Sequence, residues 1–202
     1  MSTLITTNIK HASSSSNNIV ANSDGTTTLR AGHGVIEKFF SPCDGSTISL
    51  PSGNITVQNV TAMIDLSTTW EDLTGSTITY TPPSGTKQVI YEFHFMCAHK
   101  DANGIASTSI FLDSDEIQHA KTCWRGDVYS LRAVMTWAFN IGGTTDTDVG
   151  RVASWTSDKT IKMQINNYSG SNEAYAHRLV NFGTSTTDIH PIKPSIGITA
   201  IG

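Results

Sequence analysis

The residues of this sequence best suited to binding a metal lie in the segment "EFHFMCAH", which holds His94, Cys97 and His99. Imidazole and thiolate are ligands that zinc prefers. The segment alternates in the pattern of a β-strand, in which successive side chains point to opposite faces of the sheet. Alternation places His94 on the face opposite Cys97 and His99, so a common zinc site would require a break in the strand. We therefore predict no metal site here.

Acidic residues cluster in the segments "LDSDE" (Asp113, Asp115 and Glu116) and "TTDTD" (Asp146 and Asp148). Carboxylate oxygens are calcium ligands, but neither segment follows the twelve-residue calcium-loop pattern. We interpret both as solvated loop carboxylates.

Catalysis has no recognisable motif in this chain. Ser, His and Asp are plentiful, but no Gly-x-Ser-x-Gly elbow is present. The glutamates are scattered, without the pairing that glycoside cleavage requires; they are Glu37, Glu71, Glu92, Glu116 and Glu173. We predict a protein that is not an enzyme and has no catalytic residues and no cofactor.

Carbohydrate binding is the recognition chemistry that the aromatic residues suggest. Near predicted strand ends or loops, where a ring can stack on a sugar, lie Trp70, Trp124, Trp155 and Tyr175. Packing at the edge of the core is the alternative, because tryptophan is usually mostly buried. The candidates for receptor contact, in loops around Trp124, 143–150 and 169–174, are Trp124, Arg125, Asp127, Asp146, Asp148 and Tyr175.

The composition indicates an all-β protein and argues against two other function classes. With a net charge of −4 and 15% charged residues, the chain offers no basic patch for a nucleic-acid backbone. No window approaches the roughly 18 apolar residues of a membrane span. Thr is favoured in strands, and Ser, Gly and Asn in turns. The three cysteines lack metal-site spacing, and the sequence does not decide whether Cys43 and Cys123 form a disulfide.

Period-two alternation identifies the central strands. In "LRAVMTWAFNI" every second residue from Leu131 to Ile141 is apolar. Within residues 88–97, the apolar face carries Val89, Tyr91, Phe93, Phe95 and Cys97, and the mixed face carries Ile90, Glu92, His94 and Met96. A strand against open water usually has a more polar second face, so we expect partial cover of the mixed face, for which contact with another subunit is one candidate. About nine or ten such strands indicate an antiparallel jelly-roll sandwich.

Residues 1–33 differ from the rest and are predicted to form an extended N-terminal arm, followed by a jelly-roll head at 34–202. The segment "NIVANSDGTTTL" has the pattern of a hairpin with a turn at Asp24-Gly25. A lone hairpin is marginal in water, so we expect the arm to dock on a partner. The start "MSTLITTNIKHASSSS" lacks the features of a signal peptide, from which we expect folding in a reducing cytosol.

Two stretches resemble known virion proteins. The segment "LTGSTITYTPPSGTKQVIYEFHF" is similar to a phrase common in structural proteins of marine tailed bacteriophages, cyanophage-like ones especially, and the N-terminal arm resembles that of their fibre and decoration proteins. More remotely, the head resembles the jelly rolls of the tumour-necrosis-factor and complement type, through the order of Gly75, Pro82, Gly85, Tyr91 and Phe93. This second resemblance implies a homotrimer that packs three sandwiches about an axis.

The resulting hypothesis is a non-enzymatic virion structural protein of a tailed phage, assembled in the host cytoplasm. A trimeric fibre or decoration subunit would dock on other virion proteins through its arm and contact a host surface glycan or protein through its head. The alternatives are a purely stabilising decoration protein, a carbohydrate-binding module and, last, a depolymerase.

Overall fold

The computed structural model describes residues 8–9, 19–21, 23, 27–29, 34–99, 104–125, 130–171, 173–179 and 191–202. Within these ranges the regular elements are β-strands, apart from two 3-10 helices, η1 (Gln118–Ala120) and η2 (Thr147–Val149). None of the helices in this described part is long and apolar enough to cross a membrane. The predicted all-β class is confirmed.

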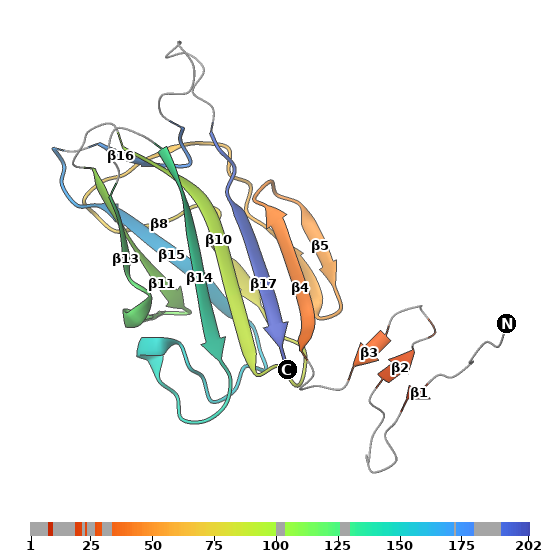
Figure 1. The fold of residues 1–202 in the computed structure, drawn as a ribbon. Helices are drawn as coiled ribbons and strands as arrows, with labels where there is room; N and C mark the ends of the chain where they lie inside the picture. The colour runs from red at the N-terminus through yellow and green to blue at the C-terminus, as the bar shows by residue number, and fades with distance from the viewer. Residues whose placement is uncertain are drawn as a thin grey trace.

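The first sheet is built around the longest strand, β10 (Gln88–His99). Along one edge β10 pairs with β14 (Ser130–Asn140), and along the other with β17 (Ser195–Ile201), which pairs in turn with β4 (Val35–Pro42). Past the end of β17, β16 (Ala174–Ala176) takes its place beside β10 and pairs with β7 (Ile64–Asp65). All these pairs are antiparallel, and β4, β17, β10 and β14 lie side by side in Figure 1.

The second sheet is built around β11 (Ile105–Leu112) and β15 (Lys159–Asn167). The outer edge of β15 pairs with β8 (Glu71–Asp72) and β9 (Ile78–Tyr80), and the outer edge of β11 pairs with β12 (Asp115–Glu116) and β13 (Thr122–Arg125). Two smaller sheets are the hairpin of β5 (Thr47–Leu50) and β6 (Gly53–Thr56), and the set β1 (Asn8–Ile9), β2 (Ile19–Ala21) and β3 (Thr27–Leu29). The pairing of β2 with β3 is the hairpin expected in the arm.

The strand order is that of a jelly roll. Numbered along the chain, the eight main strands are β4, β9, β10, β11, β13, β14, β15 and β17. In these numbers the first sheet has the order 1-8-3-6 and the second 2-7-4-5, which is the arrangement of two interlocked Greek keys. The predicted jelly-roll sandwich is therefore confirmed.

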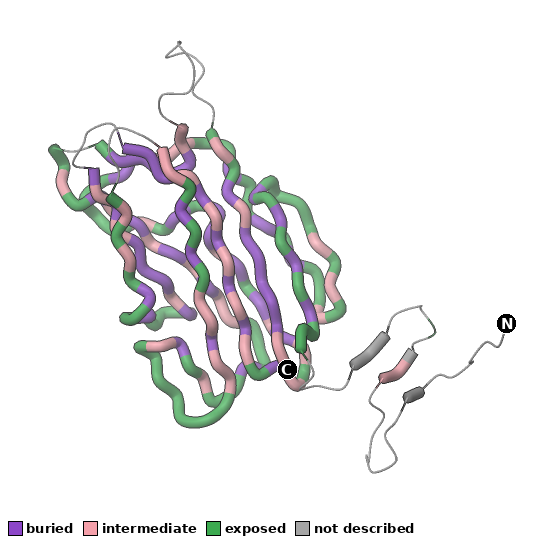
Figure 2. The backbone as a smooth tube through the Cα atoms, viewed as in Figure 1, coloured by how far each residue is buried: buried purple, intermediate pink, exposed green. Residues whose placement is uncertain are grey.

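The inward side chains of the central strands fill the space between the sheets. From Gln88 to Cys97 the inward residues of β10 are buried and its outward residues are half-buried, a pattern visible along the strand in Figure 2. From β14, Ala133, Met135 and Phe139 are buried, as the sequence predicts. The opposite sheet contributes Ile110, Ile161, Met163 and Ile165.

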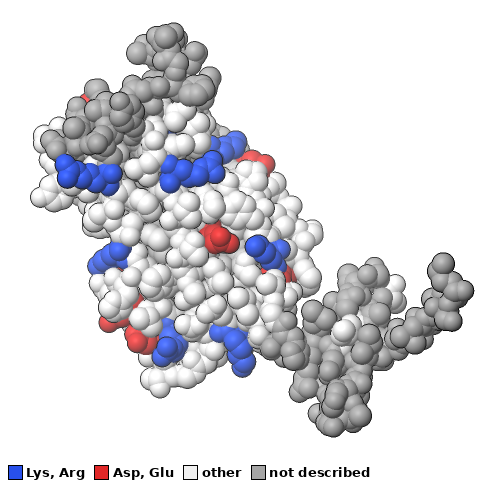
Figure 3. All heavy atoms as spheres, in the orientation of Figure 1, with Lys and Arg blue, Asp and Glu red and all other residues white. Residues whose placement is uncertain are grey.

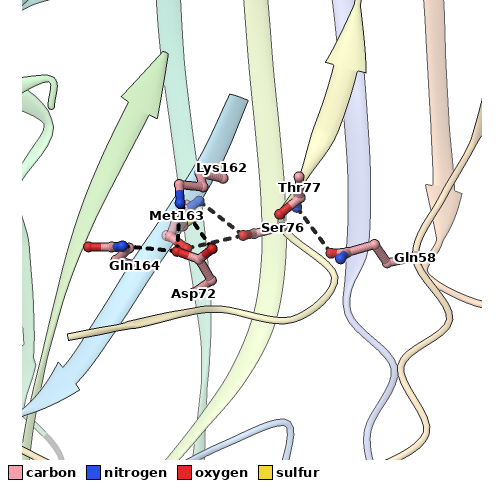
Figure 4. A network of polar contacts seen from close by, with 7 residues as sticks. All are labelled: Gln58, Asp72, Ser76, Thr77, Lys162, Met163 and Gln164. Carbon is pink, nitrogen blue, oxygen red and sulfur yellow. Dashed lines mark hydrogen bonds and ion pairs between the residues drawn. The ribbon is translucent and has the colours of Figure 1, made fainter. Parts of the chain in front are cut away.

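The turn at Gly75 and Ser76 contacts both sheets; Figure 4 shows its contact with Met163 of the second sheet. The Ser76 Oγ accepts the Met163 amide of β15 at 3.0 Å, and the Ser76 carbonyl accepts the buried Tyr91 hydroxyl of β10 at 2.7 Å. The Gly75 amide donates to Gln58 Oε1 at 2.7 Å. Gly75 has a φ of +93°, and a Cβ there would lie 2.7 Å from Val60 Cγ2. Glycine is therefore required for its backbone angle and for the space it leaves.

We predict that Gly75→Ala lowers the free energy of unfolding by about 3 kcal/mol, through backbone strain and overpacking together. The matched control is Gly53→Ala, because Gly53 has a φ of +133° but no atom within 4 Å of the added Cβ. Chemical denaturation should give a clearly smaller loss for the control. Equal losses would contradict the overpacking at Gly75.

Candidate functional site

The histidines and cysteine of β10 separate as alternation predicts. His94 points outward, where its ring meets Phe40 edge-on with centroids 4.9 Å apart. Cys97 and His99 are buried, with Cys97 Sγ 3.5 Å from His99 Nε2. Within the described ranges, no group of three His, Cys, Asp or Glu residues could hold a metal ion.

The acidic residues of "LDSDE" have structural partners. Asp113 accepts from Lys159 Nζ at 2.7 Å and from the Thr160 amide at 2.8 Å. Burial alone would raise the pKa of Asp113, but these hydrogen bonds hold the pKa below its ordinary value. Glu116 accepts from Ser109 Oγ at 2.7 Å, which lowers the pKa of the Glu116 carboxyl. The Asp113 carboxylate therefore joins the end of β11 to the start of β15, and the Glu116 carboxylate joins β12 to β11.

Two other acidic residues, the buried Glu37 and the exposed Asp72, accept hydrogen bonds within the fold. The buried Glu37 accepts from Tyr80 at 2.8 Å and from Ser52 Oγ at 2.6 Å. Asp72 binds Lys162 Nζ and Gln164 Nε2, each at 2.9 Å, in the network of Figure 4. Burial opposes the ionised form of Asp72, but the bonds from Lys162 and Gln164 prevail and lower its pKa.

Two predicted receptor-contact aromatics pack into the structure. Trp124 lies in strand β13 where the sequence suggested a loop; its ring meets Phe95 edge-on at 6.3 Å, and its indole N–H donates to Thr108 Oγ1 at 3.3 Å. Tyr175 is buried in β16, hydrogen-bonded to Glu173, with the Arg178 guanidinium 4.0 Å from the ring centroid. Pairing of β13 with β11 turns Trp124 toward the core, so core-edge packing, the alternative above, describes both rings.

Of the remaining receptor-contact candidates that the structure describes, Asp146 and Asp148 share a hollow that Arg125 does not line. Arg125 is exposed at the end of β13, and Asp127 lies outside the described residues. Asp146 and Asp148 line an open hollow of about 400 Å³ together with Thr144, Thr145, Thr147 and Arg151. Its lining is polar, whereas small-molecule pockets are mostly apolar.

The outward side of the first sheet carries the predicted interface residues Ile90, Glu92, His94 and Met96, all half-buried. Cross-strand pairing brings further side chains to this side, which we name the outward sheet face: Val35, Lys38, Phe40, Arg132, Val134 and Thr136. Figure 3 shows this view of the molecule as largely uncharged. Sequence reasoning missed Phe40 and Val134, although alternation in "VIEKFF" and "LRAVMTWAFNI" carries the signal.

Comparisons with known proteins give no family. No family model and no curated protein matches the chain. Among solved structures, it is similar to a chain in the structure of infectious bursal disease virus Gt strain. The identity is 8% and the TM-score 0.29, over 92% of this chain and 51% of that one. The protein is also similar to a chain in the structure of the Gx strain, with 7% identity and a TM-score of 0.24, over 91% of this chain and 67% of that one. The chain thus spans about half of the Gt chain, and scores this low carry no functional argument.

The other notable groups are buried histidines and free thiols. Cys43, Cys97 and Cys123 are all free, so the disulfide left open above is not formed. His177 is fully buried with a φ of +59°, and its Nε2–H donates to the Thr74 carbonyl at 2.8 Å. Burial lowers the pKa of His177 to about 4 and also lowers the pKa of His99.

We predict that acidification destabilises the protein between pH 6.5 and about 4. In this window the unfolded chain binds a proton at His177 that the folded chain excludes. The free energy of unfolding therefore decreases by about 3 kcal/mol as the pH is lowered from 6.5 to about 4. Asn tolerates a left-handed backbone, so His177→Asn should flatten the slope. Denaturation curves at several pH values check this, and an unchanged slope would contradict it.

Proposed function

We propose that this chain is a non-enzymatic structural subunit of a tailed-phage particle, a homotrimer whose outward sheet face is buried between subunits and whose head is used in host attachment. The observation that carries the proposal is the apolar character of that face. Of six exposed large apolar residues in the described part of the chain, Val35, Ile36, Phe40 and Val134 lie on β4 and β14. Exposed apolar residues gathered on one face mark an interaction surface.

The geometry of the face favours contact with a second copy. A Cβ at Gly197 would lie 2.4 Å from Phe40 Cδ2, so the Phe40 ring lies across β17 where the neighbour has no side chain. The Phe40 ring therefore covers the space above Gly197, between β4 and β10. The charges of the outward sheet face are few and of both signs, Lys38, Glu92 and Arg132, as suits a surface that meets copies of itself.

The virion role is supported by the resemblance of residues 73–95 and of the N-terminal arm to phage fibre and decoration proteins. A packed sandwich whose carboxylates serve the fold is consistent with a structural protein. A purely stabilising decoration protein would have the same interface but no host contact, and this difference separates the two candidates.

In sedimentation, we expect the purified protein to give a mass of three times 21.7 kDa. Val134→Lys should yield monomers that remain folded, because Val134 is 46% exposed and buries little within its own chain. Thr79→Lys, at an exposed β-branched residue of the opposite sheet, is the matched control and should stay trimeric. A monomeric wild-type protein would contradict the proposal.

For attachment, the full-length protein added to host cells should adsorb to them and reduce phage adsorption in a dose-dependent manner. The Val134→Lys monomer should compete less well, because it loses multivalent binding. If the wild-type protein leaves adsorption unchanged, and particles lacking it burst more readily on heating, the stabilising role is the correct one.

A further inference from the structure

Trp70 and Tyr168 form an exposed aromatic pair at one end of the second sheet, on the side away from the outward sheet face. Trp70 is 42% exposed and Tyr168 is 72% exposed. Trp70 directly precedes β8, and Tyr168 directly follows β15, the strand with which β8 pairs. The two rings therefore stand on neighbouring segments that are distant in sequence.

Several contacts hold these two segments together. The Asn167 amide donates to the Ser67 carbonyl at 2.7 Å, and Asn166 Nδ2 reaches the Thr68 carbonyl at 3.4 Å. The Tyr168 amide donates to the Ile105 carbonyl at 2.8 Å, so pairing with β11 extends one residue past the end of β15. The alternation along β15 would then place the Tyr168 ring on the outer side with Asn166. A Cβ at Gly170 would contact Thr68 Cγ2 at 4.0 Å, so the following turn lies beside the segment that carries Trp70.

Trp70 differs from the other three tryptophans, which serve the fold. The indole N–H groups of Trp124, Trp137 and Trp155 donate to Thr108 Oγ1, the Val149 carbonyl and the Tyr80 carbonyl, respectively. Neither the Trp70 indole N–H nor the Tyr168 hydroxyl has a hydrogen-bond partner among the residues that the structure describes. Each ring thus offers an apolar surface together with an unused polar atom.

We propose that Trp70 and Tyr168 form a binding site for an oligosaccharide of the host surface. An aromatic ring offers an apolar platform to the C–H face of a pyranose, and the surrounding hydroxyl and amide groups match sugar hydroxyls. Those groups are carried by Thr68, Thr69, Asn166 and Ser169. A protein partner would favour more apolar surroundings, such as those of the outward sheet face. Two platforms on separate segments suit at least two sugar units.

This site names the ligand class for the attachment role and in that respect rests on the proposed function. It also moves the contact from the predicted loops at Trp124 and 143–150 to the end of the second sheet. The site lies on the sheet opposite the proposed trimer interface, so all three copies would stay accessible and could bind together.

The test is a titration of the full-length protein with maltotetraose, cellotetraose, chitotetraose and a purified host-surface polysaccharide, followed by tryptophan fluorescence and ligand-detected NMR. At least one saccharide should bind saturably. Trp70→Ala should weaken that binding by about tenfold or more, and Tyr168→Ala should also weaken it. The control Asp146→Ala, in the 143–150 loop, should bind as the wild type does. All variants should keep the wild-type unfolding midpoint.

Absence of binding to every saccharide, or a loss in Asp146→Ala alone, would overturn the site. The same variants are then tested for adsorption to host cells. If adsorption requires Trp70 but no saccharide binds, the receptor at this site is a protein, and the proposal of a glycan ligand is wrong. Normal adsorption by both aromatic variants would overturn the site while attachment stands. Saccharide binding through Trp70 without any host adsorption would keep the site and refute attachment.

Discussion

A β-strand can place only every second side chain in the core, and this constraint on β10 organises the molecule. Val89, Tyr91, Phe93, Phe95 and Cys97 fill the space between the sheets, which commits the intervening residues to the outer side. Because β10 pairs with β14 along nearly its whole length, the same division passes to the neighbouring strand. The core and the outward sheet face are thus two results of one periodicity.

The sheets are joined by polar contacts as well as by hydrophobic packing. Ser76 binds β15 through its hydroxyl and β10 through its carbonyl, and Glu37 binds Tyr80 of the opposite sheet. A buried polar group costs free energy unless it is paired, so such bonds restrict how the two sheets can be placed against each other. Glu37, Asp72, Asp113 and Glu116 also accept hydrogen bonds within the fold.

The two outer surfaces of the sandwich differ in chemistry. The outward sheet face presents Phe40 and Val134 among few charges, which favours burial against a second copy. The end of the second sheet presents Trp70 and Tyr168 among hydroxyl and amide groups, which favours a hydrated, polar ligand. A jelly roll separates these surfaces by the full thickness of its core, so the proposed subunit contact and the proposed glycan contact would use opposite sides without competing.

The sequence by itself determined the all-β class, the central strands, the division of β10 into two faces and the separation of His94 from Cys97 and His99. These are local properties, since alternation is set by the backbone of each strand. Only the tertiary structure decided which aromatic rings are available. Trp124 turns inward because β13 pairs with β11 and packs on Phe95 of the other sheet, and Tyr175 is buried beside Arg178. The segments of Trp70 and Tyr168 meet through residues such as Thr68 and Asn166, 98 positions apart. Such proximity depends on strand pairing across the chain, which no local pattern encodes.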